Sequence, residues 1–245
     1  MHRMGRNWAI FTFLAIAVSA IVLGMIWDRT RIESSEIGNS ESLYKSNGPR
    51  MPESKAVSII GDSFTGGSPQ GGYDIAGWPS LTYRRLYTPD SPIFFVTSAK
   101  GGSGYVNQGP SRTTFVTEAE RVVNQYTDLV VFFGSQSDVN EIGQVEQSVR
   151  DAISVVRKNA PQAKILIIGP AWTRGELTPE IRKVQEAVGD AARLPGVQYV
   201  DPISEGWFFG REGDLVGADG VQPNDAGHLY MADRIEPLIR AMLEP

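Results

Sequence analysis

Cysteine is absent from the 245-residue chain, and histidine occurs only twice, as His2 and His228. The absence of cysteine excludes disulfides, thiolate metal sites and a cysteine nucleophile. Two histidines cannot build a histidine-rich metal centre, so we expect neither a metal nor another cofactor. Acidic residues outnumber basic ones and the net charge is −5. Because phosphate binding needs a basic face, we expect no nucleic-acid partner.

Charged side chains are also missing from residues 8–27 near the N-terminus. A helix of about 20 apolar residues crosses the ~30 Å hydrocarbon core of a bilayer. Arg3 and Arg6 precede this stretch, which predicts a cytoplasmic N-terminus. The alternative is a cleaved signal peptide ending at Val18-Ser19-Ala20, although the apolar run continues beyond that point. We therefore predict a single-pass membrane anchor with the C-terminal domain outside the cytoplasm, or a secreted protein if the segment is cleaved.

The chain divides into three predicted parts. Residues 1–27 are the cytoplasmic tip and the transmembrane anchor. Residues 28–53 are rich in Ser, Glu, Asn and Gly and poor in large apolar residues, which indicates a flexible linker. Residues 54–245 alternate short apolar runs with helical patterns and form the predicted folded domain.

Apolar runs and helical periodicity alternate along this domain, which predicts an α/β fold. Because the runs are apolar on both faces, they are typical of strands buried in a parallel sheet. We expect a three-layer α/β/α sandwich, in which ligands bind outside the carboxyl ends of the strands. The predicted strands are 56–60, 93–96, 129–133, 165–168 and 197–200, and the predicted helices are 78–87, 116–126, 145–159, 178–192 and 226–243.

Four short motifs carry the candidate chemistry. Gly61-Asp62-Ser63, residues 101–104 and residues 134–138 each follow a predicted strand, and residues 219–228 precede the final helix. A serine at such a strand end lies at the ligand-binding edge, where backbone amides can also hold an oxyanion. Glycines let amides approach a ligand closely. Taken singly, each motif also fits an ordinary turn.

The order and spacing of these motifs resemble the SGNH (GDSL-type) hydrolases over residues 56–243, especially exported actinobacterial members reading Gly-Asp-Ser-(Tyr/Phe)-Thr-Gly-Gly. The resemblance implies a flavodoxin-like sheet and hydrolysis of acyl or acetyl esters of carbohydrates or lipids. It implies Ser63 as the nucleophile. It also implies an oxyanion hole from the amides of Ser63 and Gly104 and the side chain at position 137, with Asp219 orienting the base.

Two positions depart from the family pattern. Ser137 replaces an asparagine, and loss of one oxyanion donor costs about 10²–10³ in rate where it has been tested. Gln222 replaces the histidine base, which leaves His228 as the remaining candidate. With Asp225 as the expected helix N-cap, His228 lies in the first turn, where the helix dipole favours a neutral ring. Alternatively, His228 only packs or hydrogen-bonds locally.

The sequence thus predicts an exported serine ester hydrolase that acts on a cell-envelope or extracellular carbohydrate or lipid ester. The changes at Ser137 and Gln222 motivate an alternative, a catalytically degenerate domain that binds envelope glycan or a protein partner. A third possibility is acyl transfer, in which an alcohol replaces water. Trp78, Trp172 and Trp207 are candidates for lining a substrate groove, or for core packing.

Overall fold

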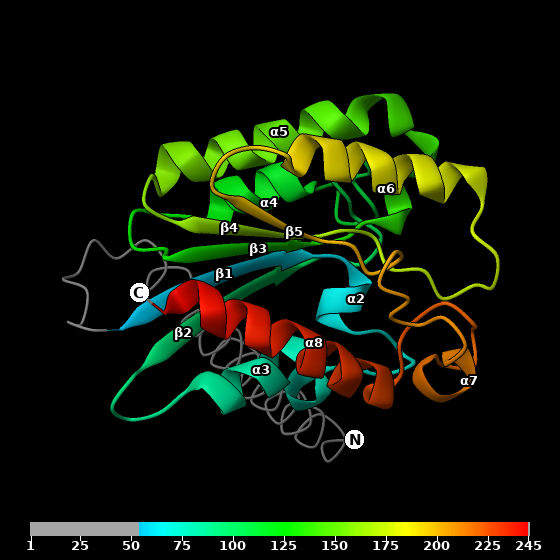
Figure 1. Ribbon diagram of the computed structural model, residues 1–245, viewed down its shortest axis with the longest axis horizontal. Helices are drawn as coiled ribbons and strands as arrows, with labels where there is room; N and C mark the ends of the chain where they lie inside the picture. The colour runs from blue at the N-terminus through cyan, green and yellow to red at the C-terminus, as the bar shows by residue number, and fades with distance from the viewer. Residues whose placement is uncertain (1–53, 245) are drawn as a thin grey trace, which may run out of the picture. The chain divides into compact units, whose positions relative to one another are not determined.

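A five-stranded parallel sheet forms the centre of the computed structural model, which describes residues 54–244 (Figure 1). The strands are ordered β2-β1-β3-β4-β5 and every neighbouring pair is parallel. The strands are β1 (Lys55–Gly61), β2 (Ile93–Ala99), β3 (Leu129–Phe133), β4 (Lys164–Ile168) and β5 (Val197–Val200). The predicted α/β fold is confirmed.

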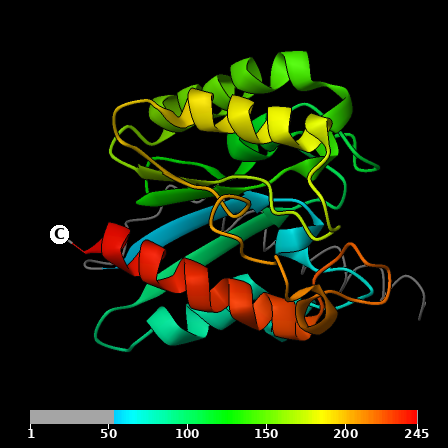
Figure 2. The ribbon, with the colours of Figure 1, turned by 45° about the vertical axis from the view of Figure 1, so that its right-hand side comes forward.

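Helices cover both faces of this sheet. Helices α4, α5 and α6 lie together on one face, and α3 and α8 lie on the other, as Figure 2 also shows. The helices are α2 (Ser63–Gly66), α3 (Trp78–Leu86), α4 (Phe115–Val122), α5 (Ile142–Asn159), α6 (Pro179–Ala192), α7 (Glu212–Leu215) and α8 (Asp225–Leu243), with 3-10 turns η1 (Asp74–Ala76) and η2 (Gln136–Asn140). The five long helices match the predicted ones, and the short elements were not predicted.

The strands are apolar on both faces because each face packs against helices. Val57 and Ile59 of β1 join the core with Trp78 of α3 and Ile235 of α8. Ser58 points the other way, and its hydroxyl donates to the carbonyl of Val122 in α4. Since strand side chains alternate between faces, the run predicts a strand buried on both sides.

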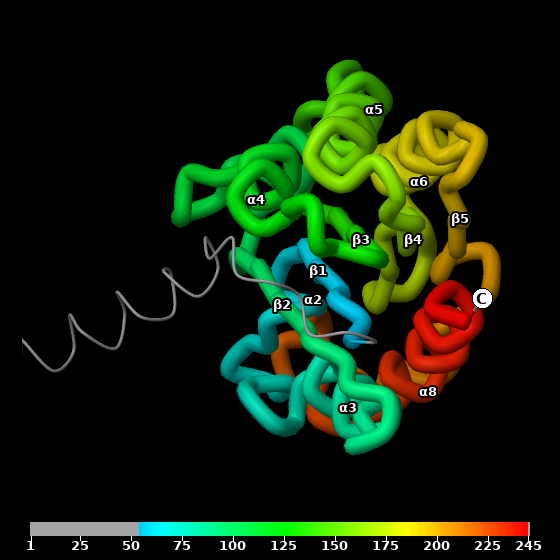
Figure 3. The backbone as a smooth tube through the Cα atoms, turned by 90° about the vertical axis from the view of Figure 1, so that its left-hand side faces the viewer, coloured from blue at the N-terminus to red at the C-terminus, as the bar shows by residue number. Residues whose placement is uncertain are grey.

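The strand order changes direction between β1 and β3. The chain leaves β1 for β2 on one side, and leaves β3 for β4 on the other (Figure 3). Loops that diverge in this way leave a crevice at the carboxyl ends of the two strands, and ligands of open α/β sheets bind there. The Ser63 turn follows β1 and residues 134–138 follow β3. The fold therefore brings both motifs to the switch point.

The predicted tip, anchor and linker, residues 1–53, lie outside the described residues. Within residues 54–244, no helix combines the length and the apolar character that a membrane crossing requires. The sheet, its covering helices and the apolar core all belong to this part of the chain.

Candidate active site

Ser63 is the first residue of α2 and is half-buried at the end of β1. Asp62 caps this one-turn helix, since its Oδ1 accepts a hydrogen bond of 2.8 Å from the amide of Phe64. The amide of Ser63 itself donates to no other described residue. The first amides of a helix lack intrahelical acceptors, so this amide is available to a negative oxygen.

Asp62 is buried, with 3 % of its surface exposed. Burial raises the pKa of this carboxyl to about 7, although hydrogen bonds from the Phe64 amide and the Ser135 hydroxyl oppose the shift. Asp62 therefore changes charge near neutral pH, directly beside the candidate nucleophile. Its oxygen is committed to the turn that presents Ser63, so its role here is to shape that turn.

Gly101 is the residue of the glycine motif that reaches Ser63. A Cβ built on Gly101 would lie 3.9 Å from the Cβ of Ser63. The Gly101 amide, like that of Ser63, makes no hydrogen bond to another described residue. These two unpaired amides belong to neighbouring strand ends, which is the arrangement an oxyanion hole needs.

Gly104, the glycine expected in that role, has another partner. Its amide donates to the carbonyl of Asn107 at 2.7 Å. A Cβ at Gly104 would come within 2.4 Å of Oδ1 of Asp138, so this position needs glycine for close packing. The oxyanion role of Gly104 stays a prediction, and Gly101 is a second candidate for it. The alignment of the family's Ser-Gly pair on Ser103 and Gly104 did not indicate Gly101, although Gly101 lies closer to the end of the strand.

The side chain of Asp138 holds the loop that follows Gly104 in place. The fully buried carboxylate accepts hydrogen bonds from the amides of Tyr105, Val106 and Asn107 at 2.8–3.0 Å. Burial nevertheless raises the pKa of Asp138 above its ordinary value. Neighbouring Ser137 is half-buried in η2, and its amide donates to the hydroxyl of Ser135 at 2.9 Å. The structure thus places Ser137 at the same sheet edge as Ser63.

Asp219 and Gln222 belong to one exposed turn before α8. Oδ1 of Asp219 accepts hydrogen bonds from the amides of Val221 (2.8 Å) and Gln222 (2.9 Å). This is a loop-capping contact, the second of the two roles that Asp219 can have. The Oε1 atom of Gln222 is buried without a hydrogen-bond partner among the described residues. Thr173, after β4, holds the turn by donating to the carbonyl of Val221 at 2.8 Å.

His228 is fully buried in the first turn of α8. Its Nδ1 accepts a 3.4 Å hydrogen bond from the Trp78 amide, and its Nε2 has no partner among the described residues. Burial lowers the pKa of His228 to about 4, with a smaller opposing effect from Asp225. The ring is neutral near neutral pH, but burial and not the helix end is the main cause. Neither nitrogen is hydrogen-bonded to Ser63, which favours the local-packing alternative.

The expected N-cap of α8 was wrong by one residue. Asn224 caps the helix by accepting from the amide of Gly227 at 2.9 Å. Asp225 is instead the first helical residue, and its Oδ1 accepts from the distant amide of Gly72 at 2.8 Å. This bond and the contact between His228 and Trp78 attach the loop after α2 to the start of α8.

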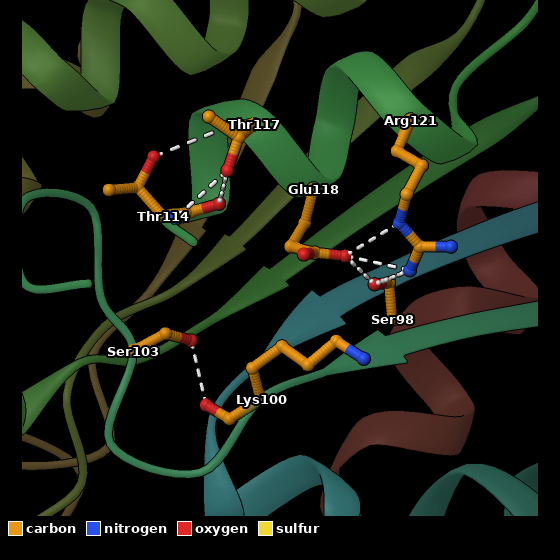
Figure 4. Close-up of polar contacts among 7 residues, drawn as sticks. All are labelled: Ser98, Lys100, Ser103, Thr114, Thr117, Glu118 and Arg121. Carbon is orange, nitrogen blue, oxygen red and sulfur yellow. Dashed lines mark hydrogen bonds and ion pairs between the residues drawn. The ribbon is translucent and has the colours of Figure 1, made fainter. Parts of the chain in front are cut away.

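A polar cluster around the buried side chain of Glu118 joins α4 to β2 (Figure 4). The carboxylate of Glu118, 2 % exposed, binds both the Ser98 hydroxyl and the Arg121 guanidinium, with contacts to Arg121 of 2.7 and 3.0 Å. Burial raises the pKa of Glu118, but these hydrogen bonds outweigh burial and hold it below its ordinary value. Among residues 54–244, no three metal-ligating side chains gather into a possible metal site.

Comparisons with known proteins agree with this geometry. The model of the GDSL-like Lipase/Acylhydrolase family matches residues 59–229. The chain belongs to this family. It is 37% identical to the GDSL lipase Rv0518 of Mycobacterium tuberculosis (strain ATCC 25618 / H37Rv) over 187 residues, which cover 75% of this chain and 80% of that protein. Family membership supports a hydrolase.

Two solved structures have a fold similar to that of this chain. A family 3 carbohydrate esterase of Clostridium thermocellum aligns with a TM-score of 0.59 and 16% identity, over 78% of this chain and 100% of that one. Est24, a carbohydrate acetylesterase from Sinorhizobium meliloti, aligns with a TM-score of 0.56 and 16% identity, over 77% and 100%. At these identities the likeness establishes the fold, which confirms the predicted sandwich.

Proposed function

We propose that this GDSL-family hydrolase cleaves carboxylic esters with Ser63 as its nucleophile. The observation that carries the proposal is the approach of Gly101, after β2, to Ser63, after β1, at the carboxyl edge of the sheet, where both residues offer an unpaired amide. Such amides stabilise the charge that develops on a carbonyl oxygen, which is often the largest single contribution to acyl-transfer catalysis.

In the proposed reaction, Oγ of Ser63 attacks the acyl carbonyl and gives its proton to solvent water, which returns a proton to the leaving alcohol. The carbonyl oxygen becomes the oxyanion and accepts hydrogen bonds from the Ser63 and Gly101 amides. Collapse of the tetrahedral intermediate breaks the ester bond, and the alcohol leaves with a proton. Water then attacks the acyl-enzyme and releases the acid, which restores the Ser63 hydroxyl.

Proton removal from Ser63 is the weak step of this mechanism. Gln222 stands where the family has its histidine, and a glutamine amide is not a base near neutral pH. His228 is enclosed by the protein and does not contact Ser63 by a hydrogen bond. We therefore propose a slow hydrolase, because a positioned acid or base contributes about 10²–10⁴ in rate. The role of His228 as base stays a prediction that its packing disfavours.

The substrate is proposed to be a carbohydrate or lipid ester of the cell envelope. This follows from the predicted anchor in residues 8–27, which would keep the domain at the outer side of the membrane. Protease added to intact cells tests this location. Removal of the domain while a cytoplasmic marker survives supports it, and protection of the domain in intact but not lysed cells contradicts it.

A second candidate function is binding without catalysis. The side chains at Ser137 and Gln222 and the enclosed ring of His228 favour it, because together they leave Ser63 without a hydrogen-bonded base. In this case the crevice would hold an envelope glycan or a protein partner, and Ser63 would be one of its contact groups.

Turnover of p-nitrophenyl acetate by the full chain separates the two candidates. The hydrolase proposal predicts a slow, saturable turnover that Ser63→Ala removes. Ser154→Ala is the matched control, since Ser154 is exposed on α5 and its hydroxyl bonds only its own helix. Equal activity in the parent and the Ser63→Ala variant would overturn the assignment of Ser63, and a complete lack of turnover would favour binding.

A further inference from the structure

A groove of about 250 Å³ opens between the loop that follows β4 and the loop that follows β5. Its walls are made mainly of large apolar side chains, with Glu212 and Ser204 among the few polar residues. The large apolar residues that line the groove are Trp172, Leu177, Ile203, Trp207, Phe208 and Phe209. Both loops leave the carboxyl ends of their strands, the same edge of the sheet at which Ser63 lies.

The floor of the groove is continuous with the residues that support Ser63. The Phe208 ring packs edge-on against Phe64, with 6.2 Å between the ring centroids, and Phe64 directly follows Ser63. Trp207 packs against Phe133 at 6.2 Å, and Phe133 packs against Phe64 at 6.4 Å. One aromatic layer therefore runs from beneath the nucleophile to the groove.

Apolar side chains line much of the groove, and three of its hydrogen-bond donors are already paired. The indole N–H of Trp172 already donates to the carbonyl of Glu176 at 3.2 Å, and that of Trp207 donates to Glu205 at 2.7 Å. The Ser204 hydroxyl donates to Asp201 at 2.8 Å. A sugar would need unpaired hydrogen-bonding groups for its several hydroxyls, whereas an alkyl chain needs only apolar contact.

Two side chains at the rim of the groove, Phe209 and Glu212, indicate which kind of ligand it favours. Phe209 is 81% exposed, so a bound apolar chain would cover a ring that otherwise faces water. Glu212 adds a half-buried carboxylate to the same lining, which disfavours an anionic ligand such as a free fatty acid. A neutral apolar chain satisfies both side chains.

We propose that this groove binds the acyl chain of the ester substrate. This proposal rests on the proposed function of Ser63 as the nucleophile. The volume of the groove limits the length of the acyl chain that it can hold. A cavity of about 150 Å³ lined by apolar side chains holds benzene, and sites for drug-sized ligands begin near 300 Å³. The groove therefore suits an acyl chain of short to medium length, longer than acetyl and shorter than the chains of membrane lipids.

Binding is tested in the full chain carrying Ser63→Ala, which cannot form an acyl-enzyme. Methyl hexanoate is titrated while tryptophan emission is followed, and Trp172→Phe identifies the signal from the groove. We expect a saturable change with methyl hexanoate that Leu177→Asp weakens at least tenfold. The control Phe94→Ser, an exposed residue of β2 outside the groove, should leave it unchanged.

The outcomes separate the groove from the catalytic assignment. A saturable response to N-acetylglucosamine but not to methyl hexanoate would overturn the acyl proposal in favour of a sugar site. No response to methyl hexanoate would also overturn it, whatever the parent does with p-nitrophenyl acetate. If binding is observed but the parent hydrolyses nothing, the groove stands and the hydrolase proposal fails.

Kinetics give a second test if the parent is active. Leu177→Asp should lower kcat/KM for p-nitrophenyl hexanoate at least tenfold more than for p-nitrophenyl acetate, because only the longer acyl chain would extend into the groove. An equal loss for both esters would contradict the proposal. Circular dichroism of the variant checks that the fold is retained.

Discussion

The imidazole of His228 lies directly against the backbone of Gly72. A Cβ built on Gly72 would come within 1.9 Å of Nε2 of that ring, closer than any real contact, and the φ angle of Gly72 is +79°. The buried ring thus fills the space beneath the loop that follows the nucleophile. One residue of α8 therefore packs directly against a loop more than 150 positions earlier in the chain.

Gly72→Ala should therefore destabilise the protein by about 1–3 kcal/mol through overpacking, with further strain from the positive φ. Urea unfolding measures the change in the free energy of unfolding. Gly210→Ala is the matched control, because Gly210 has a φ of +72° but nothing within 4 Å of an added Cβ. A loss no greater than in the control would show that His228 does not occupy the space assigned to it.

Gly101→Ala and Gly104→Ala should affect different properties. An added Cβ on Gly101 meets Ser63 at an ordinary contact distance, so we expect normal stability and a loss of activity of at least tenfold, because the methyl group crowds the acyl carbonyl. An added Cβ on Gly104 meets the buried Asp138 carboxylate, so stability should fall. Thermal unfolding and p-nitrophenyl acetate turnover, measured on both variants, would contradict this division if the effects were exchanged.

Asp62 should make the protein less stable as pH rises from about 4 to about 7. Its folded pKa of about 7 lies above the ordinary 3.8, so the folded state binds this proton more tightly. The stabilisation from protonated Asp62 is complete below pH 4 and is lost as pH rises through the folded pKa. Asp62→Asn should flatten this part of the stability profile, measured by urea unfolding at several pH values. An unchanged slope would show that Asp62 has an ordinary pKa.

His228 should make the protein less stable as pH falls, whereas Asp62 does so as pH rises. Its folded pKa of about 4 lies below the ordinary 6.5, so the unfolded state takes up the proton first. Stability is lost as pH falls from about 6.5 to 4. His228→Gln should remove this acid-side loss, which the same unfolding series detects after subtraction of the Asp62→Asn result. A profile that keeps its acid-side slope would contradict the buried, neutral state.

Gln222→His should raise esterase activity by about 10²–10⁴ if it restores a base to Ser63. The gain in activity should depend on Asp219, whose carboxylate already accepts hydrogen bonds from two amides of this turn. The double variant that also carries Asp219→Asn should therefore lose most of the gain. His228→Gln in the parent is expected to leave the turnover per folded molecule unchanged. A loss of activity there, with stability intact, would establish His228 as the base.

Much of the fold follows from the sequence, because each buried strand is a short apolar run and each long helix has its own periodicity. The start predicted for the helix over residues 178–192 agrees with the structure, where the Thr178 hydroxyl accepts a hydrogen bond from the amide of Ile181 and caps α6. Features that depend on contacts between residues far apart in the sequence could not be predicted. Asp225 resembles an N-cap, but its carboxylate bonds Gly72, 153 residues away.

The candidate site shows the same division. The position of Ser63 follows from its motif and from the rule that ligands bind at the carboxyl ends of parallel strands. Which glycine approaches it depends on the turn in which the Gly104 amide bonds Asn107. The burial of His228 depends on the packing of α3 against α8, which no single segment of sequence specifies. Among the three candidate tryptophans, Trp78 lies in the core, Trp207 is buried in the groove wall and only Trp172 is half-exposed there.

Trapping the acyl-enzyme identifies the nucleophile by its covalent modification. The full chain is mixed with p-nitrophenyl acetate, quenched in acid and digested, and the peptides are analysed by mass spectrometry. We expect one acetyl group on the peptide containing Gly61-Asp62-Ser63, located on Ser63 and absent from the Ser63→Ala variant. Acetylation of another residue, with none on Ser63 in a protein that turns over the ester, would contradict it.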